Sequence, residues 1–348
     1  MKILIIGGTN FISPPVIHRL VAMGHEVTVF HRGQTQADLP SGVDHIYGNR
    51  QNLRDFQAEF EQISPQVVLD AIAYTEQDAR TLMSTFNGIA QRVVVISSGD
   101  VYRVYDVLRG IESEPLEPLP ITETSPLRQN LYPYQDFSER PLEVPADYEK
   151  ILVERVVRND PELPGTILRL PMVYGPGDPL HRLFPYVKRM DEQRPAIVLA
   201  QRFAQWRGVW GYVENVAAAI ALAITDDRAT GQVYNIAEAE FPTEAERIRR
   251  IGQVAGWTGE VVIASPSLMP DSWSLPYNLE QHWVVDSTRI RQELGYVEPV
   301  LLAEALKRTI EWERIHSSET VSSAAAPELL DYGTEDAILA QLAAIRSL

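Results

Sequence analysis

The first residues with recognisable chemistry form a turn near the start of the chain, Gly7-Gly8-Thr9-Asn10-Phe11-Ile12-Ser13. It follows an apolar run at residues 2–6 and precedes a helix that we expect to begin near Pro14 and Pro15. A turn between a strand and a helix aims backbone N–H groups and the positive end of the helix at one point. We therefore expect this turn to bind the pyrophosphate of a dinucleotide, a tight turn without a ligand being the alternative. The expected contacts are Gly7, Gly8, Thr9, Asn10, Phe11 and Ile12.

The segments that must position this turn alternate between strand and helix patterns over residues 1–98, which indicates βαβ units and a parallel sheet. We expect strands at residues 2–6, 26–30, 44–47, 66–71 and 92–96, and helices at residues 15–23, 53–63 and 76–86. Consecutive Val and Ile residues in several strands are typical of a sheet covered by helices on both faces. Right-handed crossovers then give a Rossmann-like, doubly wound α/β fold.

The rest of the chain predicts an insertion, a second region and a tail. Residues 103–147 are rich in proline and acidic residues and lack periodicity, so we interpret them as an insertion in a dinucleotide-binding domain of residues 1–170. Residues 171–316 are expected to form a smaller α/β substrate-binding region, interleaved with the first domain. We expect helices at residues 148–158, 213–224, 243–255 and 301–315, and strands at 166–170 and 232–236. The tail, residues 317–348, combines a flexible linker at 317–326 with a short helix near 335–345.

The composition excludes several classes of function. The 348 residues include 31 basic and 47 acidic side chains, for a net charge of −16, and no cysteine. Thiol nucleophiles, thiolate metal sites and disulfides are therefore excluded, and the seven histidines lack metal-ligand spacing. The negative charge argues against nucleic-acid binding, and no apolar stretch is long enough to span a membrane. We expect a cytoplasmic protein with a small polar substrate and no metal.

Seven ordered motifs resemble the extended short-chain dehydrogenase/reductase family, specifically its NAD-dependent epimerase/dehydratase group. They are the glycine turn and residues 97–102, 150–154, 168–178, 212–217, 233–236 and 293–296. Asn10 and Ser13 stand where the family usually has its second and third glycines. Asparagine tolerates a left-handed backbone and serine is small, so we expect dinucleotide binding to survive; a turn that no longer admits the dinucleotide is the alternative. The resemblance also implies a possible homodimer.

The resemblance implies a pyridine dinucleotide cofactor. After the second strand, relatives that use NAD place a carboxylate on the ribose, whereas this chain has His31 and Arg32. The missing acid and the added arginine favour a 2′-phosphate, so NADP(H) is preferred and NAD(H) is possible. Alternatively, Arg32 is an ordinary solvated loop residue. The remaining implied cofactor contacts are Asn49, Arg50, Ala71, Ile72, Ala73, Lys150, Pro171 and Val173.

The resemblance further implies catalysis by a tyrosine acid/base, a lysine four residues later and a hydroxyl near the fifth strand. Lys150 and Ser98 match two of these positions, but Ala146 stands where the tyrosine belongs. Tyr148 is two residues before Lys150, and positions i and i+2 of a helix point about 200° apart. Tyr148 can therefore join Lys150 only if the helix begins after it. The alternatives are that Tyr132 or Tyr134 of the insertion takes over, or that the acid/base is lost.

On the substrate side we expect contacts from Asp100, Tyr174 and Arg207. Asp100 matches an acid of dehydratase-type relatives, and Arg207 is the best candidate in a cationic cluster that could hold a diphosphate. The predicted function is an NAD(P)-dependent epimerase, dehydratase or reductase acting on a sugar-like or nucleotide-sugar substrate. Two alternatives remain open, namely a non-catalytic NAD(P)-binding or sensor protein and an RNA-binding member of the family. The cluster comprises His181, Arg182, Lys188, Arg189, Arg202 and Arg207.

Overall fold

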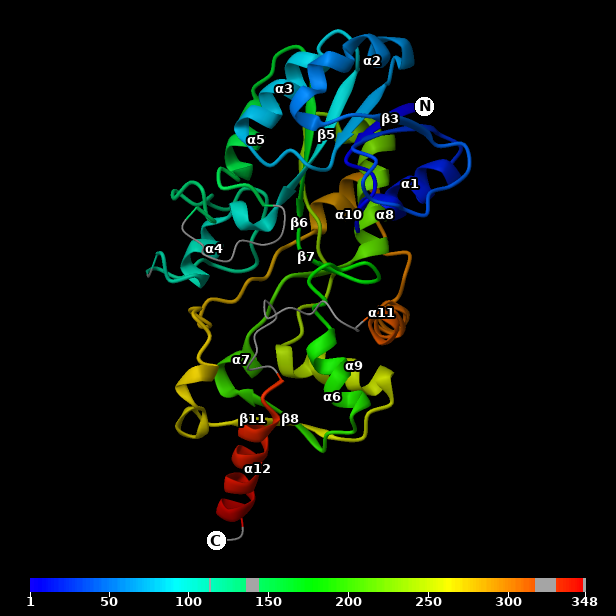
Figure 1. Ribbon diagram of the computed structural model, residues 1–348. Coiled ribbons are helices and arrows are strands. Elements are labelled where there is room, and N and C mark those ends of the chain that lie inside the picture. Colours follow the sequence, from blue (N-terminus) through cyan, green and yellow to red (C-terminus); the bar gives the residue numbers. More distant parts are fainter. Residues whose placement is uncertain (113, 136–143, 317–329, 347–348) are drawn as a thin grey trace.

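A parallel sheet of seven strands organises the computed structural model, which describes residues 1–112, 114–135, 144–316 and 330–346 (Figure 1). The strand order is β10-β6-β5-β4-β1-β2-β3, and every neighbouring pair is parallel. This order confirms the expected Rossmann-like, doubly wound fold. The strands are β1 (Lys2–Ile6), β2 (Glu26–His31), β3 (Asp44–Tyr47), β4 (Val67–Asp70), β5 (Arg92–Ser98), β6 (Gly165–Leu170) and β10 (Val233–Asn235).

Helices cover both faces of the sheet because successive strand residues alternate between the two faces. Ile3 and Ile5 of β1 join a core that includes α1 (Ser13–Ala22), α8 (Val213–Thr225) and α10 (Thr288–Leu294). Leu4 and Ile6 instead join a second core with α2 (Gln57–Ile63), α3 (Glu76–Phe86) and α5 (Lys150–Arg158). The central strands are therefore buried on both sides, as their Val and Ile content predicts.

The remaining elements of the C-terminal half lie beyond the carboxyl end of the sheet (Figure 1). Two pairs of parallel strands form there, β7 (Met172–Tyr174) with β9 (Trp210–Tyr212) and β8 (Ala196–Ala200) with β11 (Glu260–Ala264). Because β10 returns to the main sheet, the C-terminal half is interleaved with the N-terminal half. The helices are α6 (Phe184–Asp191), α7 (Gln201–Gln205), α9 (Glu244–Ala255), α11 (Leu302–His316) and α12 (Tyr332–Arg346).

Several short elements were absent from the sequence prediction. The expectation that residues 103–147 lack periodicity was wrong at their start, where α4 (Arg103–Leu108) forms. Val104, Val107 and Leu108 are buried on one face of this helix, but six residues are too few for such a pattern to stand out. Other elements of eight residues or fewer were missed for the same reason, namely α6, α7, α10, β7, β8, β9 and β11. Residues 113, 136–143 and the linker 317–326 lie outside the described residues.

Candidate active site

Three loops meet at the carboxyl edge of the sheet, where β1, β4 and β5 end. The strand order reverses at β1, which lies between β4 and β2, and open α/β sheets bind ligands at such a switch point. The glycine turn leaves β1, residues 71–74 leave β4, and residues 98–100 leave β5. Most of the predicted cofactor and catalytic residues lie on these loops or next to them.

The glycine turn fits an anionic group. Gly7 has φ 83°, and a Cβ atom there would lie 2.7 Å from the Ile72 side chain, so this position requires glycine. Ser13 takes the place of a third glycine and donates its hydroxyl hydrogen to the Gly7 carbonyl oxygen at 2.8 Å. The first turn of α1 contains no acidic residue, and its cap at Ile12 provides no side-chain hydrogen bond. The positive end of α1 is therefore free of a carboxylate from its own first turn, as pyrophosphate binding requires.

The end of β2 carries a pair of imidazoles. His31 ends the strand, and its Nε2 atom lies 2.9 Å from Nδ1 of His45 on β3. The neighbouring Arg32 is exposed. Asn49 accepts a hydrogen bond from the backbone of Gln51 and begins a short 3-10 helix.

The Arg50 guanidinium forms ion pairs with two carboxylates of the protein, whereas the sequence predicted a contact with the cofactor. Its Nη1 atom donates to Oδ2 of Asp70 at 2.6 Å, and its Nε atom lies 2.9 Å from the Asp78 carboxylate. Asp70 is fully buried at the end of β4, and its second oxygen accepts the N–H of Ile72. This ion pair fixes the loop that passes the glycine turn. The sequence offers no local signal for it because Arg50, Asp70 and Asp78 lie on three different elements.

The structure places Tyr148 just before helix α5. Helix α5 begins at Lys150 with Glu149 as its cap, and Tyr148 belongs to the entry turn, where its N–H donates to the Pro145 carbonyl. The helical spacing that would separate the two side chains therefore does not apply. The Lys150 Nζ atom lies 5.8 Å from the centre of the Tyr148 ring. It donates to the carbonyl oxygens of Ala73 at 2.7 Å and Ile96 at 2.8 Å.

The Tyr148 hydroxyl lies in a buried polar cluster. It donates to Oδ2 of Asp100 at 2.9 Å, and Ser98 forms a hydrogen bond with the same hydroxyl. Burial raises the pKa of Tyr148 well above its ordinary value, and the Asp100 carboxylate adds to this rise. Burial also raises the pKa of Asp100 and lowers the pKa of Lys150 to about 8. Tyr148 is therefore protonated at neutral pH, and Lys150 is easier to deprotonate than an ordinary lysine.

The insertion contributes to this cluster. The hydroxyl of Tyr134 donates to Oδ2 of Asp100 at 3.1 Å, and its ring packs edge-on against Tyr148 at 5.2 Å. Tyr132 has an exposed side chain, although its backbone N–H donates to Glu149. Of the two insertion tyrosines considered as alternatives, only Tyr134 brings its hydroxyl to Asp100.

Two residues missed by the sequence analysis hold the entry turn. Arg128 of the insertion forms two hydrogen bonds of 3.0 Å with Glu149, and both side chains are fully buried. Glu149 is the residue between Tyr148 and Lys150, and it also accepts the N–H of Ile151 to cap α5. An arginine in an acidic segment gives no sequence signal of a partner 21 positions away.

The remaining predicted contacts lie in different surroundings. Ala71, Ile72 and Ala73 follow β4 at the carboxyl edge, while Pro171 and Val173 lie at and after the end of β6. Tyr174 is buried among Trp210 and Tyr212, so its side chain is part of the core in this structure. Arg207 donates from Nη1 to the Phe241 carbonyl oxygen.

Each residue of the expected cationic cluster contacts a different group of the protein. Five of its members pair with carboxylates, and Arg207 bonds a carbonyl as described. The charges of Arg182, Lys188, Arg189 and Arg202 are therefore largely compensated within the protein. The pairs are His181 with Glu313, Arg182 with Asp178, Lys188 with Glu192, Arg189 with Glu335 and Arg202 with Glu280.

The family model described as the NAD dependent epimerase/dehydratase family matches residues 3–237. The chain belongs to this family. Membership confirms the resemblance noted in the motifs, and it agrees with the seven-stranded sheet and with the position of the glycine turn.

Curated relatives of this epimerase/dehydratase-family chain differ in what their names describe. An uncharacterized protein, y4nL of Sinorhizobium fredii, is 27% identical over 55% of this chain, which spans 61% of that protein's length. The 2′-dehydrokanamycin reductase of Streptomyces kanamyceticus is 23% identical, with 86% of this chain and 78% of the relative covered. The chloroplast stem-loop binding protein of 41 kDa b of Arabidopsis thaliana is 22% identical over 88% of this chain and 77% of the relative.

Solved structures of the family share the fold. The dTDP-glucose 4,6-dehydratase of Bacillus anthracis, solved in complex with NAD, aligns with a TM-score of 0.66 and 17% identity over 91% of this chain and 97% of that one. The UDP-glucose 4-epimerase of Thermotoga maritima, solved with UDP-glucose, aligns with a TM-score of 0.64 and 20% identity over 90% and 99% of the two chains. At these identities the likeness establishes the fold alone.

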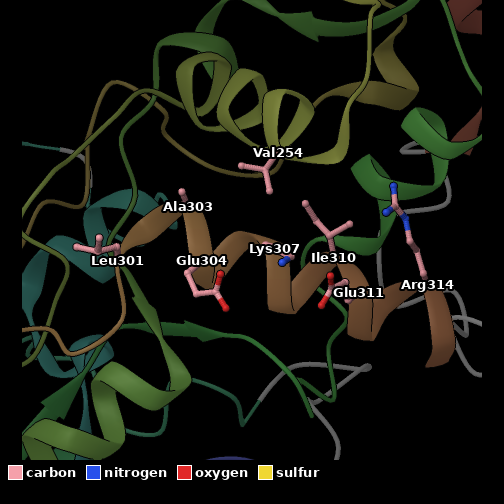
Figure 2. Close-up of a pocket in the computed structure, with 8 residues that line it drawn as sticks. All are labelled: Val254, Leu301, Ala303, Glu304, Lys307, Ile310, Glu311 and Arg314. Atoms are coloured by element: carbon pink, nitrogen blue, oxygen red, sulfur yellow. The ribbon is translucent and has the colours of Figure 1, made fainter.

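Other features of this family member lie away from the carboxyl edge. A pocket of about 450 Å³ lies between α11 and the end of α9, and none of its lining residues is a predicted site residue (Figure 2). Among the described residues, no group of three or more His, Asp or Glu side chains is arranged to hold a metal. No helix in the described ranges is long and apolar enough to cross a membrane.

Proposed function

We propose that the protein is an NAD(P)-dependent oxidoreductase that reduces a carbonyl group of a sugar-like substrate. The observation that carries this proposal is the placement of the Tyr148 hydroxyl, Ser98 and Lys150 together at the carboxyl edge, beside the glycine turn. Carbonyl reduction needs a proton donor and a second hydrogen bond at one oxygen atom. Epimerases and dehydratases of this family would use the same three groups.

The protonation state of Tyr148 favours reduction. Burial and Asp100 both raise the pKa of Tyr148, so the phenol carries its proton at neutral pH and can deliver it to an oxygen that becomes negative. Ser98 would donate a hydrogen bond to that same oxygen. Lys150 would hold the nicotinamide ribose and balance the charge that Tyr148 acquires. A bound reduced nicotinamide would supply the hydride to the carbonyl carbon.

We further propose NADP(H) as the preferred cofactor. The last residue of β2 is His31 rather than a carboxylate, and His45 adjoins it at 2.9 Å. The Gly33 N–H donates to Nδ1 of His31 and Nε2 of His31 bonds His45, so, beside Arg32, Nε2 of His45 is the imidazole donor left for a 2′-phosphate. A carboxylate that would repel this phosphate is absent from the last position of β2. NAD(H) lacks the 2′-phosphate and gains nothing from these groups.

Titration calorimetry with NADPH and NADH, followed by a screen of sugar-like ketones for NADPH oxidation, tests the proposal. We expect NADPH to bind, and Tyr148→Phe to lose turnover while it keeps the cofactor. Absence of heat with both nucleotides would overturn the dinucleotide site. If Tyr148→Phe and Lys150→Met leave every activity unchanged while the cofactor still binds, the protein is a binding or sensor protein instead. The low exposure of Tyr148, 6%, favours this second candidate.

A further inference from the structure

The indole of Trp283 has an unused hydrogen-bond donor next to the proposed site. Trp283 is 7% exposed, and its Nε1 atom has no hydrogen-bond partner among the described residues. A Cβ atom built on Gly99 would lie 3.1 Å from Cζ2 of Trp283 and 3.7 Å from Cε2, the carbon that carries Nε1. The indole therefore lies against the segment between Ser98 and Asp100. A buried N–H without a partner is rare in proteins because water no longer satisfies it.

Asp100 has an unused acceptor in the same place. Its Oδ2 atom accepts from Tyr148 and Tyr134, whereas Oδ1 is buried and has no hydrogen-bond partner among the described residues. Trp283 lies against Gly99, and Asp100 is the next residue in the chain, so the unpaired donor and the unpaired acceptor both belong to residues that adjoin Gly99. A molecule that carries neighbouring hydroxyl groups can satisfy both, since each hydroxyl donates and accepts.

We infer that the substrate is a hydroxylated ring without a phosphate group, held by Nε1 of Trp283 and Oδ1 of Asp100. This inference rests on the proposed function because it places the ring beside Tyr148. It separates the protein from enzymes that act on sugar nucleotides, although the chain shares their fold.

Aromatic side chains around the two polar atoms suit such a ring. The Tyr105 ring lies 5.4 Å from the Trp283 ring and 6.4 Å from the Tyr134 ring, and Tyr134 in turn packs against Tyr148. Aromatic faces pack against the apolar C–H faces of a ring, while a few polar atoms fix its orientation.

The charges of this region oppose a diphosphate. Arg128 is committed to Glu149 through two hydrogen bonds, and Lys150 is held by two carbonyl oxygens. Arg109 lies over the Tyr105 ring and donates to the Pro133 carbonyl oxygen. The Asp100 carboxylate forms no ion pair within the part of the chain that the structure describes. A buried diphosphate requires paired cations, and these are engaged elsewhere.

Ligand binding to protein saturated with NADPH or NADH tests the inference. The probes are glucose, glucosamine, kanamycin, UDP-glucose and dTDP-glucose, observed by saturation-transfer NMR and calorimetry. We expect at least one phosphate-free compound to bind, UDP-glucose and dTDP-glucose to bind no more tightly than glucose, and Trp283→Phe to weaken binding about tenfold. Comparing glucose with glucosamine and kanamycin shows whether an ammonium group adds affinity.

Matched variants distinguish recognition from packing. Trp312→Phe is the control because Trp312 stacks on His181 and lies on α11. It should change neither cofactor nor sugar binding. Asp100→Asn keeps the size of the side chain and tests the acceptor separately, with the melting temperature of each variant recorded. The inference fails if a nucleotide sugar binds more than tenfold tighter than glucose, if no phosphate-free ring binds, or if both variants bind as the wild type does. Failure of NADPH and NADH to bind would instead overturn the proposed function.

Discussion

The hydroxyl group of Tyr148 donates a hydrogen bond of 2.9 Å to Oδ2 of Asp100, 48 positions earlier in the chain. This contact joins the entry turn of α5 to the loop after β5. Together with burial, which is the larger cause, it raises the pKa of Tyr148, and the phenol also bonds Ser98.

Removing the Tyr148 hydroxyl should abolish proton transfer without unfolding the protein. We expect Tyr148→Phe to lower kcat for carbonyl reduction by about 10²–10⁴-fold, because general acid catalysis contributes a factor of that size. Tyr134→Phe is the matched comparison, since Tyr134 donates to the same carboxylate oxygen. A larger loss of kcat in Tyr134→Phe than in Tyr148→Phe would assign the acid to the insertion.

Lys150 should make the stability of the protein depend on pH in the mildly alkaline range. Burial lowers the pKa of Lys150 to about 8 in the folded protein, from 10.5 when unfolded. The unfolded chain therefore binds more protons between these values, and the free energy of unfolding should rise with pH from about 8 to 10. The Lys150 contribution is roughly 2 kcal/mol over this window. Denaturant titrations at pH 7.5 and 9.5 give the change in the free energy of unfolding between the two pH values. This change should be more positive by roughly 2 kcal/mol in the wild type than in Lys150→Met. Equal changes in the two proteins would contradict the prediction.

The ion pair between Arg128 and Glu149 should support both stability and catalysis. Glu149→Gln leaves the Arg128 charge buried without its carboxylate, and breaking such a pair costs about 3–5 kcal/mol. Glu149 lies between Tyr148 and Lys150 and caps α5, so a change at Glu149 should also displace these two side chains. The kcat of the molecules that remain folded should therefore fall. Urea denaturation and kinetics on the same samples measure the two effects. The pair of Arg228 and Asp226, in which the arginine is exposed, provides the control, and Asp226→Asn should change stability by less than about 1 kcal/mol.

Arg50 should behave as a structural residue. Its guanidinium pairs with the fully buried Asp70, so Arg50→Met should lower the free energy of unfolding by about 3–5 kcal/mol. The affinity of the folded protein for NADPH should change little by comparison, which calorimetry at low temperature can measure. A stable variant with much weaker NADPH binding would restore the cofactor role that the sequence suggested.

The end of β2 should determine the choice of cofactor. His31→Asp introduces a carboxylate at the ribose position and should shift the ratio of NADPH to NADH affinity towards NADH by about tenfold or more. Arg32→Gln should weaken NADPH binding and leave NADH binding nearly unchanged. Equal effects of either variant on both nucleotides would show that this position does not read the 2′-phosphate.

The fold was determined largely by local patterns in the sequence. The strand patterns predicted all seven strands of the main sheet, and the turn at Gly7 and Gly8 marked the first strand-to-helix junction. These features were predictable because strand and helix periodicities, and the backbone freedom of glycine, depend on residues close together in the chain.

The site depended on tertiary structure. The sequence identified Tyr148 and Lys150 but left three interpretations open, because the start of α5 decides their relative positions. That start depends on Glu149, which Arg128 of the insertion holds. The sequence likewise predicted that Arg50 contacts the cofactor, whereas in the structure its guanidinium forms an ion pair with the buried Asp70. Pairings between residues far apart in the chain are selected by burial, which removes charges from water and makes each require a partner. The spacing of residues in the sequence does not show which of these distant residues will pair.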